Sequence, residues 1–326
     1  MFKAVLCRDP SVNSRMVLGQ LASRPLQPGE VRIRARACGV NFPDLLMTTG
    51  RYHVVPDSPF TPGFEAAGVL SEVAPDVSGW KAGDSVMVRM WYGCYSEEIV
   101  TDAQNLLALP QGFSFEDGAT FILAASTAVN AVMQRGQLQA GETLLVHGAG
   151  GGVGLAAVEV GKLLGATVIA TASSQEKLDI VSSRGADHCI NHVTHDFREE
   201  VLRLTGEHGA DVIFDPVGGD VFNKSLRCVA WGGRILVVGF ASGTIPEIKM
   251  NQPLLKCCSI IGVRAIEHLK KSPVEGKAYI KQMMDWAGQG RLRPHISHAF
   301  PLERFQEGLD AVSGRKAIGR VVLTIG

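Results

Sequence analysis

Between residues 143 and 263, short β-branched and aliphatic runs alternate with segments whose hydrophobic positions recur at helical spacing. Residues 143–146 predict a strand, and 153–164 predict a helix that ends at Gly165. Further strands are expected at 167–171, 189–191, 211–215, 234–239 and 259–263. Parallel strands need long crossover connections, and helix-length segments separate most of these strands. The pattern therefore predicts an α/β fold with a doubly wound parallel sheet.

The segments on either side have a different pattern. Residues 1–124 are rich in proline and glycine and contain alternating runs at 31–35 and 84–88, typical of short antiparallel strands in a barrel-like domain. After residue 264 come a helical segment near 275–288 and strand patterns at 298–300 and 319–324. We expect this tail to return to the first domain. The predicted organisation is a domain at 1–124, an inserted α/β domain at 125–264 and a return at 265–326.

Composition narrows the class of protein. A chain of 326 residues, 46% hydrophobic and 20% charged, is an ordinary globular chain with room for about two domains. Lysine plus arginine and aspartate plus glutamate both number 32, so no overall charge favours nucleic acid or an anionic membrane. The seven cysteines show no paired CxxC spacing, which argues against a zinc ribbon and a disulfide framework. No apolar stretch reaches about 18 residues, and the first residues lack a signal-peptide pattern. We expect a cytoplasmic protein; a mitochondrial location, with a presequence outside this sequence, stays open.

A glycine-rich turn, HGAGGGVG at 147–154, joins the first predicted strand to the helix that follows. Ala149, Gly151 and Gly154 occupy the three small positions of a G-x-G-x-x-G turn, where they permit a tight turn, close approach of a pyrophosphate and close helix packing. The free N–H groups of the helix also favour phosphate. We predict that a dinucleotide is bound by Ala149, Gly150, Gly151, Gly152, Val153 and Gly154. A turn needed only for packing is the alternative.

The end of the second strand indicates which dinucleotide. An NAD site usually has an acidic residue there for the ribose hydroxyls. This chain has Ser173 and Ser174 instead, followed by Lys177, whose ammonium can neutralise a 2′-phosphate. NADPH is therefore predicted over NADH, with a capped helix and a solvated lysine as the alternative.

Several motifs together resemble one family. Gly141, Glu142, Leu145, the glycine turn and Lys162 resemble the signature of the quinone oxidoreductase and zeta-crystallin branch of the medium-chain dehydrogenase/reductase superfamily, except that Glu159 stands where the signature usually has glutamine. Residues 38–70, FDPVGGD at 214–220 and the closing GRKAIGRVVLTIG extend the resemblance over almost the whole chain. It implies a Rossmann domain inserted in a GroES-like β-barrel catalytic domain, NADPH as cofactor, and a homodimer joined through edge strands of the α/β domains.

The resemblance also bears on zinc. Zinc-dependent relatives have a cysteine where this chain has Asn41, and Gly-His-Glu where it has Gly63, Phe64 and Glu65. A catalytic zinc needs about three nitrogen, sulfur or oxygen ligands, and Phe64 offers none. The four-cysteine lobe of those relatives has no counterpart. We therefore predict no metal site, and Cys38 is interpreted as a small buried residue.

Without a Lewis acid, reduction of a quinone or an activated C=C bond fits better than oxidation of an alcohol, because it needs only a hydride and a hydrogen-bond donor. The resemblance implies that Asn41 and Tyr52 are the donors and that Asp44 orients them. A turn-forming asparagine and a packed aromatic ring are the alternatives.

Further cofactor contacts are expected at the carboxyl ends of the strands, at Phe240, Val263 and Arg264. The resemblance adds Thr127 near the nicotinamide and pyrophosphate. It also places His192 and Arg315 at the 2′-phosphate, with a surface histidine and a solvated arginine as alternatives. Val129 and Asn130 depart from the family pattern, so the shape of the substrate pocket stays open.

Three functions follow as hypotheses. The first is an NADPH-dependent quinone oxidoreductase, and the second is an NADPH-dependent reductase of α,β-unsaturated carbonyls or enoyl thioesters. The third is a non-catalytic protein that holds NADPH, as a crystallin does, or that binds RNA. Neutral net charge and the lack of a basic stripe with interleaved aromatic residues argue against RNA.

Overall fold

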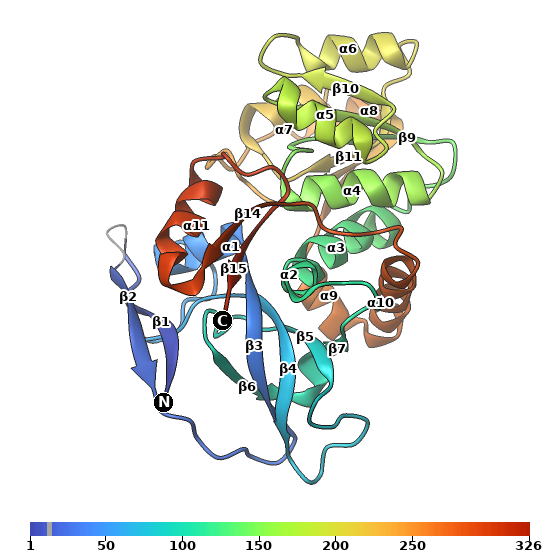
Figure 1. The fold of residues 1–326 in the computed structure, drawn as a ribbon. Coiled ribbons are helices and arrows are strands. Elements are labelled where there is room, and N and C mark those ends of the chain that lie inside the picture. Colours follow the sequence, from blue (N-terminus) through green and yellow to red (C-terminus); the bar gives the residue numbers. More distant parts are fainter. Residues whose placement is uncertain (12–14) are drawn as a thin grey trace. The chain divides into compact units, whose positions relative to one another are not determined.

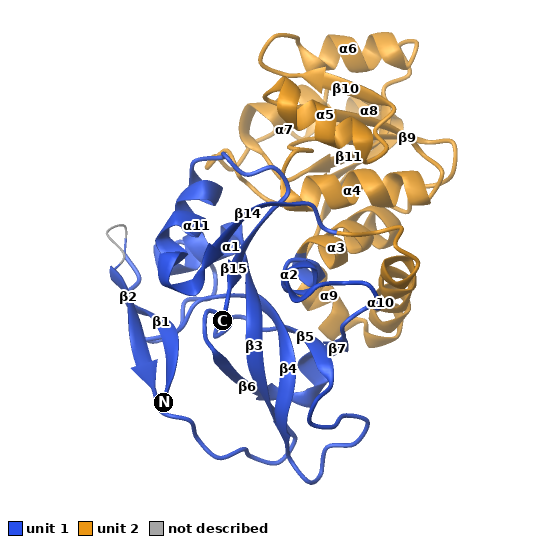
Figure 2. Ribbon diagram, in the orientation of Figure 1, with its two compact units in different colours: residues 1–123, 294–326 blue, residues 124–293 orange. Residues whose placement is uncertain are grey.

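The computed structural model describes residues 1–11 and 15–326 and contains two compact units. Unit 1 comprises Met1–Leu123 and Pro294–Gly326, and unit 2 comprises Ala124–Arg293 (Figure 2). The α/β unit is thus an insertion in the sequence of unit 1. The chain returns to unit 1 at residue 294, whereas the sequence placed that return at 265. The difference is two helices, α9 (Ala265–Lys271) and α10 (Pro273–Gly288), which pack on each other within unit 2.

Unit 2 is built on a six-stranded sheet (Figure 1). Its strands are β8 (Thr143–Val146), β9 (Thr167–Ala172), β10 (His188–Asn191), β11 (Ala210–Asp215), β12 (Val229–Val237) and β13 (Ser259–Gly262). The spatial order is β10-β9-β8-β11-β12-β13, and every neighbouring pair is parallel. Numbered from the first strand of the unit, this is the order 3-2-1-4-5-6 of the doubly wound dinucleotide-binding fold. The predicted fold class and all six predicted strands are confirmed.

Helices precede, connect and follow these strands, and apolar side chains are buried between helices and sheet. They are α3 (Ile122–Val129), the π-helical segment η2 (Asn130–Arg135), α4 (Gly152–Leu163), α5 (Gln175–Ser183), α6 (Phe197–Leu204), α7 (Gly219–Ser225) and α8 (Asn251–Lys256), followed by α9 and α10. On the sheet, Leu145, Ile213 and Ile235 are fully buried. A Cβ at Gly161 of α4 would lie 2.6 Å from the Leu144 side chain. The small residue therefore lets α4 approach the sheet closely.

Unit 1 contains a seven-stranded, mainly antiparallel sheet and a separate two-stranded ribbon. The sheet comprises β3 (Glu30–Val40), β4 (Glu65–Val73), β5 (Ser85–Arg89), β6 (Glu98–Asp102), β7 (Leu106–Ala108), β14 (Ile296–Pro301) and β15 (Arg320–Thr324), and the ribbon is β1 (Phe2–Asp9) with β2 (Arg15–Leu21). The β14–β15 pair is parallel, because helix α11 (Phe305–Ser313) provides the crossover between them. Two further helices, α1 (Phe42–Thr48) and α2 (Phe115–Ala119), complete the unit with the short 3-10 segments η1 (Ala103–Asn105) and η3 (Leu302–Arg304).

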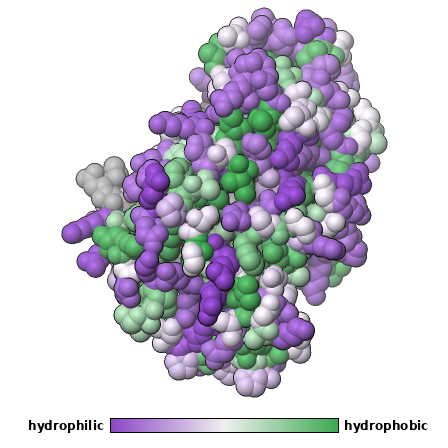
Figure 3. Space-filling view, viewed as in Figure 1, coloured by the Kyte–Doolittle hydropathy of each residue, from purple (hydrophilic) through white to green (hydrophobic). Residues whose placement is uncertain are grey.

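Within residues 1–11 and 15–326, no helix combines the length and apolar character needed to cross a membrane. The face drawn in Figure 3 shows hydrophilic residues interspersed with smaller hydrophobic areas. Several of the large apolar side chains that lie exposed belong to α8 and its neighbours, among them Met250, Leu254 and Leu255.

Candidate active site

The predicted cofactor residues of unit 2 gather at one edge of its sheet. The turn at 149–154 follows β8, Ser173 to Lys177 follow β9, and His192 follows β10. In the other half of the sheet, Phe240 lies after β12. Val263 and Arg264 come directly after β13. Since all six strands are parallel, their carboxyl ends lie at the same edge, and β8 and β11 meet where the strand order reverses. This switch point is where such sheets bind dinucleotides.

Two glycines of the turn, Gly151 and Gly154, are small for different reasons. A Cβ at Gly154 would lie 2.4 Å from the Gly148 carbonyl oxygen, so the fold itself excludes any side chain there. At Gly151 the nearest atom to an added Cβ is 3.4 Å away, and φ is −87°, a conformation open to every residue. Packing therefore explains Gly154 but not Gly151. The N-cap residue of α4 is Gly151, which makes no side-chain hydrogen bond to the first turn, and a helix start of this kind suits a phosphate.

Three predicted 2′-phosphate contacts lie close to this turn. The Ser174 hydroxyl accepts a hydrogen bond from the Lys177 backbone N–H at 3.4 Å and so caps α5, as predicted. The aliphatic stem of Lys177 packs on Gly150, where an added Cβ would lie 3.0 Å from it. The His192 backbone N–H donates to Ala172 O at 3.1 Å, and loss of hydration, then the Lys177 charge, lowers the pKa of His192. Lys177 thus lies beside the glycine turn, and its charge acts on His192.

The other predicted cofactor residues belong to elements other than the glycine turn. Phe240 is 37% exposed and packs at Gly218, where an added Cβ would lie 2.8 Å from its ring. Thr127 is half-buried on α3, and Arg264 directly precedes α9. Arg315 belongs to unit 1, after α11, so its contact with the adenosine phosphate stays a prediction.

In unit 1, Asn41 belongs to a buried network with Glu65 and Arg320. The Asn41 Nδ2 donates to Glu65 Oε1 at 3.2 Å and to Gly39 O at 3.3 Å, and its Oδ1 accepts from Arg320 Nη2 at 2.8 Å. Arg320 Nη2 also forms a short ion pair with Glu65 Oε1. Glu65 Oε2 accepts the Leu123 backbone N–H at 2.9 Å. The network fixes the start of α1 against β4 and β15.

Asp44 holds the same segment from the other side. Its Oδ2 accepts the Asn41 backbone N–H at 2.8 Å and the Tyr95 hydroxyl at 2.9 Å, which agrees with an orienting role. Its Oδ1 is buried without a hydrogen-bond partner among the described residues. Burial raises the pKa of Asp44 to about 7, although both hydrogen bonds and Arg320 act in the opposite direction. The Asp44 carboxyl is therefore much more easily protonated than an exposed aspartate.

Tyr52 belongs to a closed cycle of four rings. Its ring meets Phe64 edge-on, with centroids 5.6 Å apart, and Phe64 meets Trp91 at 6.1 Å. Trp91 in turn lies edge-on to His53 at 5.9 Å, and His53 packs on Tyr52 at 4.2 Å. Phe64 is fully buried, whereas Tyr52 and Trp91 are half-buried and His53 is exposed. Phe64, at the position where the family resemblance places a zinc ligand in metal-dependent relatives, is thus one ring of an aromatic cluster.

Comparison with known proteins agrees with both halves of this architecture. Residues 27–133 match the family model of the alcohol dehydrogenase GroES-like domain, and residues 152–287 match that of zinc-binding dehydrogenase. The chain is 36% identical over 326 residues to quinone oxidoreductase-like protein 2 of Bos taurus, covering 99% of this chain and 93% of that relative. The chain belongs to the quinone oxidoreductase family of medium-chain dehydrogenases/reductases. It is also 35% identical over 302 residues to 2-haloacrylate reductase of Burkholderia sp, covering 91% of each chain. The solved structure of a mycobacterial protein complexed with NADPH has a TM-score of 0.89 and 27% identity, and the match covers 99% of both chains.

As a member of this family the chain is an oxidoreductase, and one family model is named for zinc. In the part of the chain that the structure describes, no group of three or more histidine, cysteine, aspartate or glutamate side chains is arranged to hold a metal ion. Glu65 is engaged by Arg320, and Cys38 Sγ donates to Cys94 O at 2.5 Å. Burial raises the pKa of Cys38 to about 12, which keeps it a thiol. A zinc-independent reaction stays our prediction on these residue types.

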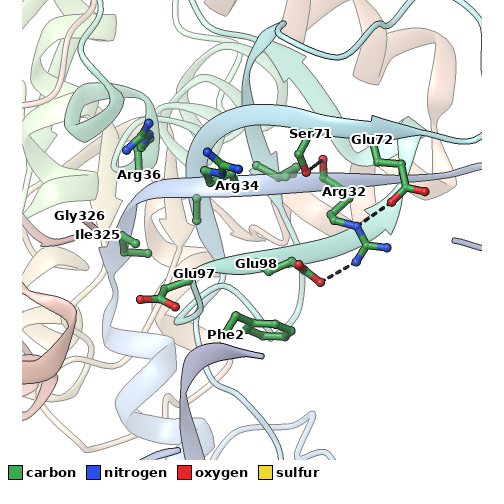
Figure 4. Close-up of a pocket in the computed structure, with 12 residues that line it drawn as sticks. Phe2, Arg32, Arg34, Arg36, Ser71, Glu72, Glu97, Glu98, Ile325 and Gly326 are labelled. Carbon is green, nitrogen blue, oxygen red and sulfur yellow. Dashed lines mark hydrogen bonds and ion pairs between the residues drawn. The ribbon is translucent and has the colours of Figure 1, made fainter. Parts of the chain in front are cut away.

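A pocket of about 650 Å³ lies beside β3, β4 and β6 in unit 1 (Figure 4). Arg32 is one of its lining residues, and its guanidinium pairs with Glu72 at 2.8 Å and with Glu98 at 2.5 Å. None of the predicted site residues lines this pocket. Its ion pairs join three strands, so we interpret it as part of the surface of the sheet and not as the substrate site.

Three residues of this oxidoreductase were not found from the sequence: Arg320, Tyr95 and Trp91. Arg320 had a signal, since a charged residue within the apolar strand pattern GRVVLTIG needs a buried partner. Tyr95 and Trp91 had no such signal in the sequence. Their partners, Asp44 and Phe64, lie 51 and 27 positions earlier in the chain.

Proposed function

We propose that this family member is an NADPH-dependent quinone oxidoreductase that transfers hydride without a metal. The observation that carries the cofactor assignment is Gly151, whose lack of a side chain the fold does not require but a pyrophosphate does. The uncapped first turn of α4 offers backbone N–H groups to the phosphates. Lys177, held on Gly150, would neutralise the 2′-phosphate, assisted by Ser173, Ser174 and His192.

NADPH, when bound, supplies a hydride to the acceptor. A quinone, NADPH and one proton then give the hydroquinone and NADP⁺, so the protein must stabilise the oxyanion that develops on the acceptor and deliver a proton to it. We assign Tyr52 and Asn41 as hydrogen-bond donors and Asp44 as the group that orients Asn41. The two Asn41 Nδ2 hydrogen bonds, at 3.2 and 3.3 Å, are longer than the usual 2.9–3.0 Å. To donate to an acceptor, Asn41 would have to exchange one of these two hydrogen bonds for one to the developing oxyanion.

Steady-state rates with 9,10-phenanthrenequinone, 1,4-benzoquinone, a 2-alkenal and crotonyl-CoA test the substrate class. We expect the quinones to be reduced fastest. The second candidate, reduction of α,β-unsaturated carbonyls or enoyl thioesters, is favoured by the similarity to 2-haloacrylate reductase. Turnover of crotonyl-CoA or the alkenal that is faster by orders of magnitude would establish that candidate instead. Quenching of intrinsic fluorescence by NADPH without any turnover would support a non-catalytic NADPH-binding protein.

Tyr52→Phe tests the donor and keeps the ring in its cluster. Removing one oxyanion donor lowers kcat by about 10²–10³. The dissociation constant of NADPH should not change, because the substitution removes only a hydroxyl that we assign to the acceptor. An unchanged kcat would show that Tyr52 does not donate to the acceptor and only packs in the aromatic cluster.

We also propose a homodimer joined through β13. This strand ends the sheet of unit 2, so one side of it has no neighbouring strand among the described residues. Ile260 on the strand and Leu254 and Leu255 on α8 expose 37%, 73% and 68% of their surface. An edge strand beside exposed apolar residues pairs readily with a copy of itself across a two-fold axis. Light scattering should give the dimer mass for the wild type and the monomer mass for Ile260→Lys; a monomeric wild type would refute the proposal.

A further inference from the structure

The four-ring cluster of Tyr52, His53, Phe64 and Trp91 suggests how the acceptor is selected. Its contacts form a closed cycle, and three of the four are edge-to-face with interplanar angles between 71° and 90°. Phe64 and Trp91 each make two such contacts, whereas Tyr52 and His53 make one each and meet each other at 47°. Edge-to-face contacts have favourable quadrupole geometry, and together the four rings form an aromatic wall.

The backbone holds the two sides of this wall together. The Met90 N–H donates to Phe64 O at 2.8 Å, which brings Trp91 beside Phe64, and the Tyr52 N–H donates to Leu46 O at 3.1 Å at the end of α1. The buried ring of Phe64 supports the two half-buried rings, and His53 lies outermost. The wall thus has a buried base and an accessible upper part, and it includes Tyr52, the proposed donor to the substrate.

We propose that Trp91 and His53 determine specificity by stacking against acceptors with fused aromatic rings. This inference rests on the proposed quinone reductase activity. A polycyclic quinone has flat apolar area beyond its reacting carbonyls, whereas a monocyclic quinone, a short enal and an acyl thioester do not. Only the polycyclic acceptor gains from rings next to Tyr52, so the wall favours it over the smaller ones.

Trp91→Leu is the main test, and Tyr92→Leu is the matched control. Tyr92 neighbours Trp91 in the chain and is 43% exposed, but its ring contacts Phe60 and is outside the cycle. In Trp91→Leu we expect kcat/KM for 9,10-phenanthrenequinone to fall roughly three- to tenfold relative to 1,4-benzoquinone, as expected for one lost aromatic contact. The change should lie in KM, with NADPH affinity unchanged. The control should keep the wild-type ratio.

His53→Leu provides the same test at an exposed position where folding is not at risk. It should lower the same ratio in the same direction. Equal losses for both quinones, or the same selectivity loss in Tyr92→Leu, would overturn the inference while leaving the quinone reductase proposal intact. A wild-type protein that reduces neither quinone would overturn the proposed function and this inference with it.

Discussion

Gly151 and Gly154 lie three residues apart in one turn, but their replacement by alanine should have different effects: Gly154→Ala should lower stability, and Gly151→Ala should lower NADPH affinity. Gly154→Ala places a methyl group 2.4 Å from Gly148 O and 2.8 Å from Ala149 Cα. Backbone atoms cannot give way as a flexible side chain can, so the start of α4 must shift. Such overpacking costs about 1–3 kcal/mol. At roughly 2–4 °C per kcal/mol for a domain of this size, Tm should fall by about 2–12 °C.

Gly151→Ala should leave the apoprotein nearly unchanged, because the new methyl group meets nothing closer than 3.4 Å and the backbone is extended. The methyl group would instead occupy the place where the pyrophosphate approaches the backbone. A similar overpacking cost of about 1–3 kcal/mol, present only in the complex, should weaken NADPH binding roughly five- to 150-fold.

Thermal unfolding with and without NADPH separates the two effects. Wild-type protein at 100 times its dissociation constant gains about 2.7 kcal/mol from the ligand. Gly151→Ala should unfold like the wild type without NADPH and lose about 0.9–2.4 kcal/mol of the stabilisation that NADPH gives, whereas Gly154→Ala should already be destabilised alone. Wild-type NADPH affinity in Gly151→Ala would refute the argument, since the turn would then not hold the pyrophosphate.

Three other substitutions test single interactions. Lys177→Ala should weaken NADPH about 10- to 100-fold with little effect on NADH, as expected for one charge-assisted hydrogen bond of roughly 1.5–3 kcal/mol; equal losses in calorimetric titrations would make the lysine a solvated side chain. Arg320→Met leaves Glu65 as an uncompensated buried charge, so the free energy of unfolding in urea should drop by about 3–5 kcal/mol, with recovery when Glu65→Gln is added; no recovery would mean that packing, not charge, is lost. Burial raises the pKa of Glu159 to about 7 from a usual 4.5, so the folded state retains a proton that the unfolded chain releases, and this stabilisation is present below pH 4.5 and lost as the pH rises to 7. Compared with Glu159→Gln, the wild type should lose up to about 3 kcal/mol across that window, and parallel stability curves would contradict the shifted pKa.

Much of unit 2 follows from local pattern alone. Each of its strands is a short apolar run bounded by helix-period segments, and the strict parallel topology brings every strand's carboxyl end to one edge. Residues just after those ends, such as Gly151, Ser174 and His192, must therefore lie near one another. A sequence is enough to predict such a site because its geometry depends on chain order and not on side-chain packing.

Unit 1 is different, because its site depends on pairing between distant segments. Arg320 reaches Glu65, 255 positions earlier, only because β15 pairs with β3 in one register and β3 with β4 in another. A shift of one residue in either pairing would turn Arg320 or Glu65 to the opposite face of its strand. Tyr95 meets Asp44, and Trp91 meets Phe64, also across segments that are far apart in the chain. Local hydrophobic pattern specifies that strands form, but antiparallel register and packing select which polar and aromatic side chains meet, and those are properties of the folded chain.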